Sequence, residues 1–172
     1  MEDKKPSFKQ ALDATILWCN AWEEGNLSDE VLADRIAELV ETHEGARGFF
    51  VISLSSDCPL MDRLPEPLIF QLRKVGESIV DLTTKNLAMS SAMAVHHRRN
   101  QDKKHLSGSE RIIARCTELL KVLEPNSVKK HLETLLDATI GKGNKVDFLE
   151  RWGYDNEQKK AIAFNINAIA EN

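Results

Sequence analysis

The chain has 172 residues, of which 42% are hydrophobic and 29% charged, and it contains 8 glycines and 5 prolines. This composition excludes a disordered or fibrous protein and disfavours an all-β sandwich, which needs many tight turns. The net charge is −4 and no apolar run approaches the roughly 18 residues that span a bilayer, so the sequence predicts one globular domain, residues 1–172, without a membrane segment.

The first part of the chain predicts two amphipathic helices followed by an ambiguous segment. Apolar residues recur every three or four positions over residues 7–24 and 28–44, as one face of a helix requires. Gly25 and Gly45 are expected to end these helices. Residues 49–57 begin with an apolar and aromatic run that also suits a buried strand. Because no other segment offers a strand partner, we expect a short buried helix or an irregular core segment there, although helix and strand both remain open.

A long central helix is predicted over about residues 66–100. Pro65 and Pro67 suit its first turn, where a missing N–H has no partner to lose. Apolar residues then alternate in steps of four and three, which indicates a helix that packs along its whole length. Such a helix measures roughly 50 Å, and Gly76 is the place where we expect any bend.

Further helices are predicted in the last third of the chain. Ser107 with Glu110, and Asp155 with Gln158, form the pattern of a capping box at a helix start. The approximate ranges are 107–124, 126–140, 145–152 and 156 to the C-terminus. About six or seven helices with short connections predict an all-α protein built as a helical bundle.

The most distinctive polar residues lie in the second half of the long helix. Asn86 interrupts its apolar seam, and Met89, Met93, His96 and His97 follow. These residues predict a small-ligand or metal site, since thioethers adapt to ligands and imidazoles bind metals. The metal is the weaker alternative, because adjacent histidines point about 100° apart on a helix, and we expect no metal and no cofactor. A purely structural role, with Asn86 setting helix register, is the competing interpretation.

A basic segment follows over residues 98–115. Arg98, Arg99, Lys103 and Lys104 can bind an anion or nucleic acid through their charge. The sequence argues against nucleic acid, because the chain is acidic overall and no aromatic residues alternate with the basic ones. Cations at the end of a helix also complement its dipole, so a solvated helix terminus is the simpler interpretation.

Charge is distributed unevenly along the chain. Residues 1–44 hold 4 Lys or Arg against 11 Asp or Glu, whereas residues 96–115 hold 6 against 2. Such segments can dock on each other within one chain or between two. The three cysteines are widely spaced and form no CxxC pair, which favours free thiols and a cytoplasmic location.

No nucleophile, base and orienting group stand in a recognisable catalytic pattern, so an enzyme is the less favoured class. We therefore predict a non-catalytic helical interaction or scaffold protein, whose partner is another protein or a second copy of the chain in a homodimer. A small-ligand or metal site near Asn86, Met93 and His96 is one alternative function. Binding of an anion or nucleic acid by the basic segment is the other.

Overall fold

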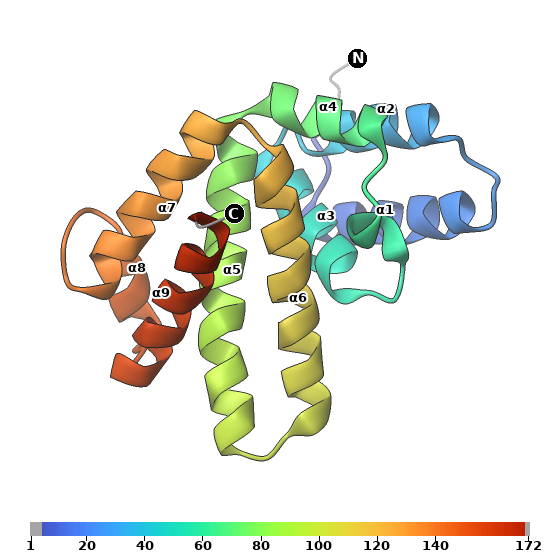
Figure 1. The fold of residues 1–172 in the computed structure, drawn as a ribbon. Helices are drawn as coiled ribbons and strands as arrows, with labels where there is room; N and C mark the ends of the chain where they lie inside the picture. The colour runs from blue at the N-terminus through green and yellow to red at the C-terminus, as the bar shows by residue number, and fades with distance from the viewer. Residues whose placement is uncertain (1–4, 171–172) are drawn as a thin grey trace. The chain divides into compact units, whose positions relative to one another are not determined.

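The computed structural model describes residues 5–170 and is all-α, as predicted (Figure 1). Nine α-helices and one 3-10 helix occur among these residues, and no strand does. None of the described helices is long and apolar enough to cross a membrane. The contacts group into two compact units, one ending at Ile79 and one beginning at Val80, and each is described by itself. The prediction of a single domain stays a prediction.

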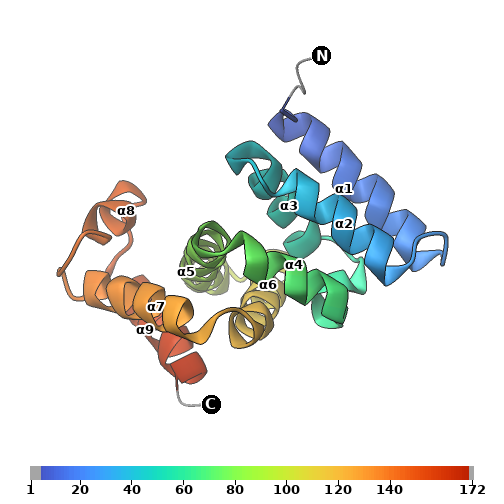
Figure 2. The ribbon, with the colours of Figure 1, turned by 90° about the horizontal axis from the view of Figure 1, so that it is seen from above.

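The first unit pairs its helices through close packing. Helix α1 packs on α3, and α2 packs on α4 (Figure 2). Ser7 starts α1 with a capping box, because its hydroxyl accepts from the Gln10 N–H while the Gln10 side chain accepts from the Ser7 N–H. The elements are α1 (Phe8–Glu23), α2 (Asp29–Leu39), α3 (His43–Ser55), a 3-10 helix η1 (Pro59–Asp62) and α4 (Glu66–Val75).

The prediction of one helix over residues 28–44, ended by Gly45, is wrong. Helix α2 ends at Leu39, and Gly45 lies inside α3, where its backbone N–H donates to the Thr42 hydroxyl at 3.1 Å. A Cβ at Gly45 would lie 1.8 Å from the Leu39 carbonyl oxygen. The glycine therefore permits a close approach of two backbones. The ambiguous segment 49–57 continues α3 up to Ser55 as a buried helix, led by Phe49 and Phe50.

The predicted helix over residues 66–100 is divided at Gly76. This glycine adopts φ +93° and ψ −138°, a conformation that an L-residue rarely adopts and a helix cannot contain. The break leaves α4 before it and the 23-residue α5 (Glu77–Arg99) after it. The prediction of a long helix is confirmed, with a start 11 residues later than expected. The break at Gly76 and the separate helix α3 explain why the described residues form nine α-helices, whereas the sequence predicted about six or seven.

The second unit packs its remaining helices around α7. Helix α7 contacts α8 and α9, and α6 contacts α7 and α9. Asp102 starts α6, because its carboxylate accepts from the His105 backbone N–H at 3.2 Å. The start predicted at Ser107 is therefore wrong, because residues 103–106 form the first turn of α6. The elements after α5 are α6 (Lys103–Val122), α7 (Pro125–Thr139), α8 (Val146–Arg151) and α9 (Asn156–Ala170).

Helix α9 is tied to α5 by two side-chain hydrogen bonds. The predicted capping box at its start is confirmed, since the Asp155 and Gln158 side chains each accept from the other's backbone N–H at 3.0 Å. The Gln158 amide also donates to the Ala92 carbonyl at 3.2 Å. Two helix turns beyond, Asn165 donates to the Ser91 hydroxyl at 2.8 Å. Helix α9 is thereby fixed against α5 at Ser91 and Ala92.

Candidate ligand-binding site

The predicted ligand residues of α5 do not line either of two hollows in the second unit that are described below. The Asn86 amide donates to the Leu82 carbonyl at 2.9 Å, so it is satisfied within its own helix. Met93 and His96 are exposed, whereas Met89 and His97 are half-buried. A ligand site at these residues stays a prediction.

Imidazoles gather at the turn between α5 and α6. The ring centroid of His97 lies 5.5 Å from that of His96 and 5.4 Å from that of His105. The His105 ring also lies 2.6 Å from the Asp102 carboxylate. The backbone N–H of His105, followed by its ring, lowers the pKa of the Asp102 carboxyl. Within residues 5–170, no three His, Cys, Asp or Glu side chains are placed to hold a metal ion.

The predicted anion-binding residues differ in their surroundings. The Arg99 guanidinium donates to both oxygens of Asp155, at 2.7 and 3.1 Å, and to Glu157 at 2.7 Å. This hydrogen bonding, helped by the backbone N–H of Gln158, lowers the pKa of Asp155 to about 2. Arg99 is thus already paired with two carboxylates. Lys103 and Lys104 are exposed in the first turn of α6, and Arg98 lines the smaller hollow.

The larger hollow, which we call the apolar groove, has a volume of about 530 Å³ and is lined by residues of α6, α7 and α9. Helix α7 lines it from Pro125 to Leu136, a length of roughly 16 Å at the helical rise of about 1.5 Å per residue. Its floor is apolar and between 2% and 8% exposed. The floor residues are Leu120, Leu123, Val128, Leu132, Ile166 and Ile169. An apolar hollow of this volume is in the size range of sites for small apolar molecules.

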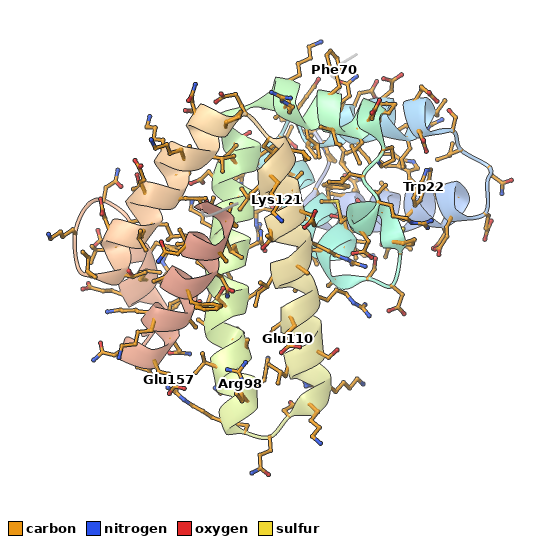
Figure 3. All side chains as sticks on the ribbon, viewed as in Figure 1. Trp22, Phe70, Arg98, Glu110, Lys121 and Glu157 are labelled. Carbon is orange, nitrogen blue, oxygen red and sulfur yellow. The ribbon has the colours of Figure 1, made fainter. Side chains whose placement is uncertain are left out.

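Polar side chains surround the mouth of the apolar groove. They are Lys121 on α6 (Figure 3), Lys129 and Glu133 on α7, and Asn167 on α9. Lys129 and Glu133 form a loose, exposed pair with 4.0 Å between nitrogen and oxygen. Lysines carry their charge on long flexible stems, so both amines can reach a group at the mouth. Lys121 is also paired, with 3.3 Å between its amine and the Glu118 carboxylate. The charged residues that line the groove are thus two lysines and one glutamate, and a ligand's anionic group would compete with Glu118 and Glu133 for the two amines.

The matching family adds no chemistry to this geometry. The chain belongs to a family described as "Uncharacterised conserved protein UCP020893". Its profile matches residues 7–169. Comparisons with curated proteins and with solved structures found no match.

The sequence reading missed the apolar groove. Leu132 and Ile166 fall on the apolar faces of the helices predicted over residues 126–140 and from residue 156 onward, as core residues do. Pro125, which directly precedes the first of these predicted ranges, is the first residue of α7. Helical periodicity identifies an apolar face, but it does not show whether a neighbouring helix fills the space opposite that face. No signal in the sequence distinguishes these residues from fully packed core residues.

Proposed function

We propose that this protein is a non-catalytic binding protein that holds a slender apolar molecule with an anionic head group in the apolar groove. The observation that carries the proposal is the combination of a nearly buried apolar floor with Lys121 and Lys129 at the mouth. Small-molecule sites are usually of this kind, with apolar walls and a few polar groups that orient the ligand. Straight-chain carboxylates are the simplest probes of that chemistry.

The affinity of the apolar groove should increase with the length of the ligand's alkyl chain. Each methylene buried contributes about 0.8 kcal/mol, or roughly a fourfold gain in affinity. Affinity should therefore rise steeply from hexanoate to octanoate to decanoate, until the chain exceeds the groove. Isothermal titration calorimetry measures these steps directly. A flat affinity along the series would contradict binding in the groove.

The head group should be selected by charge. Decanoate, decan-1-ol and decylamine have the same chain but carry a negative, a neutral and a positive head. We expect the carboxylate to bind most tightly and the amine least, because the rim lysines attract an anion. Equal affinity for all three would leave a hydrophobic hollow without head-group recognition and would overturn that part of the proposal.

Adjacent lysines on α7 provide a matched control. Lys129 lines the groove and Lys130 does not, so Lys129→Glu and Lys130→Glu make the same charge change on two sides of one helix. Lys129→Glu should weaken decanoate binding roughly three- to tenfold, since an exposed ion pair contributes up to about 1 kcal/mol and reversal adds repulsion. Lys130→Glu should leave it within about twofold. Equal losses would indicate a general surface-charge effect.

A second variant pair fills space without changing charge. Leu136 lines the groove, whereas the exposed Ile140 at the end of the same helix does not. Leu136→Phe should block the longest chains first, and Ile140→Phe should bind like the wild type. Circular dichroism checks that both variants keep their helices.

The interaction-protein function is a second candidate, favoured by an exposed apolar surface on α1 and α3. Leu17 is 65% exposed, Val51 48% and Ile16 44%. Glu23 and Asp57 lie beside Ile16 around one small hollow. An apolar segment with basic flanks, carried by another protein, would complement this surface.

A photo-crosslinking residue at position 17, with one at the exposed position 140 as control, tests the second candidate. We expect position 17 alone to yield an adduct, and the captured segment to be apolar and basic. A captured segment of this same chain would instead support the predicted homodimer. Native mass spectrometry reports that oligomeric state independently.

We also propose a cytoplasmic location. The cysteines Cys19, Cys58 and Cys116 are buried and not joined by a disulfide. Buried cysteines that form no disulfide are typical of a reducing compartment. Localisation of a tagged protein by fluorescence microscopy tests this, and a secreted or periplasmic signal would contradict it.

A further inference from the structure

A second hollow in the second unit, which we call the polar slot, lies between α5, α6 and α9 and has a volume of about 480 Å³. Small side chains create the room, because Ala94, Ala114 and Ala161 come from the three different helices. Larger residues at these positions would close the space. The slot is separate from the apolar groove, since α9 lines the slot with Phe164 and Asn165 and the groove with the next two residues.

Opposite charges border the polar slot without pairing. Arg98 comes from α5 and Glu110 from α6, and Figure 3 shows both beside the two helices. Side chains on a helix lean toward its N-terminus, and α5 and α6 run antiparallel, so these two lean toward each other. No ion pair within 4.0 Å joins either of them to another side chain in the described part of the chain. Arg99, one residue away, shows the contrast with its two carboxylate partners.

A fixed amide, that of Asn165, also lines the polar slot. The Asn165 N–H donates to the Ser91 hydroxyl at 2.8 Å, and that hydroxyl donates to the Leu87 carbonyl at 2.7 Å. These two hydrogen bonds orient the amide, and its oxygen has the capacity to accept a further hydrogen bond. Phe164 lines the same hollow and is 73% exposed, so its ring offers an apolar surface to a bound molecule.

We propose that the polar slot binds a small zwitterion of the amino-acid type. A guanidinium binds a carboxylate through two parallel N–H donors, which is the role of Arg98. The Glu110 carboxylate and the Asn165 oxygen accept N–H bonds from the ligand's ammonium group. Ile113 and Phe164 contact a short apolar side chain. This ligand differs in class from the occupant of the apolar groove, so either site can fail without the other.

The probes are L-leucine and two fragments of it. 4-Methylpentanoate lacks the ammonium group, and 3-methylbutylamine lacks the carboxylate. We expect leucine to bind at least about tenfold more tightly than either fragment, since each fragment loses one charge-assisted contact. NMR chemical-shift titration of the 172-residue chain identifies the residues that the ligand contacts and also gives its affinity. Absence of binding by leucine and by the other free amino acids, or equal binding of the fragments, overturns the proposal.

Charge-neutralising variants assign the roles. Arg98→Gln and Glu110→Gln should each weaken leucine binding at least about tenfold. The controls are Lys104→Gln and Glu150→Gln, which remove the same charges at exposed positions outside the slot and should leave the affinity unchanged. Equal weakening by Arg98→Gln and Lys104→Gln would show unspecific attraction and overturn the assignment.

A filling variant tests the hollow itself. Ala114→Leu adds volume to the slot without touching a charged group and should abolish leucine binding, while decanoate binding in the apolar groove persists. Ala163→Leu on α9, outside the slot, is the control and should bind leucine normally. Retained leucine binding in a folded Ala114→Leu protein would place the ligand elsewhere and refute the site.

Discussion

Gly48 is a position in the first unit where a single added methyl group should disturb the packing of α1 on α3. A Cβ built on this glycine would lie 2.4 Å from the Cβ of Ala11 and 3.1 Å from the Leu12 backbone nitrogen. Carbon atoms in ordinary contact lie about 3.5 to 4.0 Å apart. Gly48→Ala therefore has to push α1 away from α3 by more than an ångström, and the contact is with backbone-proximal atoms that cannot rotate aside.

The expected magnitude combines two opposing effects. Replacing glycine by alanine inside a helix stabilises it by about 1 kcal/mol. Overpacking of a tight contact destabilises by about 1 to 3 kcal/mol, and the 2.4 Å approach lies at the severe end. We expect Gly48→Ala to lower the free energy of unfolding by about 1 to 2 kcal/mol. Gly108→Ala is the matched control, because nothing lies within 4 Å of its Cβ position in α6, and it should stabilise by about 1 kcal/mol.

Urea denaturation followed by far-UV circular dichroism and tryptophan fluorescence measures both changes. Trp18 and Trp22 lie on α1, so fluorescence reports mainly on the helix pair that Gly48→Ala disturbs. Ala11→Gly should partly rescue Gly48→Ala, since it removes the opposing Cβ, and a double-mutant cycle isolates that coupling. A Gly48→Ala protein as stable as the wild type, or an unrescued loss, would refute the close-packing argument.

Three further predictions concern individual side chains. Asp155→Asn keeps a capping group but removes the carboxylate that Arg99 holds. The pKa of Asp155 in the folded protein is about 2, below its ordinary value, so the carboxylate stabilises the fold above about pH 4 and this stabilisation is lost as the pH falls toward 2. The urea midpoints of the wild type and the variant should therefore converge in acid. Ser7→Ala removes the hydroxyl that caps α1 and should cost about 1 kcal/mol, measured as a lower thermal midpoint; an unchanged midpoint would contradict the capping role. Burial raises the pKa of the Cys116 thiol, so thiol alkylation of this residue, followed by mass spectrometry, should be slow in the folded protein and fast in urea.

Much of the helical structure follows from local patterns. The apolar period of three to four residues located α1, α7 and α9 to within about two residues, the usual uncertainty of helix ends. The Asp155–Gln158 capping box also formed as predicted, because its partners are three residues apart and form bonds within one turn. Interactions of this range depend little on the rest of the chain.

The helix boundaries were predicted wrongly where two local signals competed, or where a contact between two helices determined the boundary. Asp102 and Ser107 are both capping residues, and the choice of Asp102 extended α6 by one turn. Gly45 was expected to end a helix, as glycine often does. In the structure it permits a backbone approach to Leu39 that only the packing of α2 and α3 requires.

By itself, then, the sequence determined the fold class and most helix positions, whereas the tertiary structure decided where hollows remain. Leu132 and Ile166 have the same apolar periodicity as fully packed core residues, and Arg98 looks like any cation at a helix end. What distinguishes them is the space opposite, which depends on where helices more than 30 residues apart come to lie. Periodicity shows on which face of its own helix a residue lies. Whether that face is covered or lines a binding site depends on the position of helices from other parts of the chain.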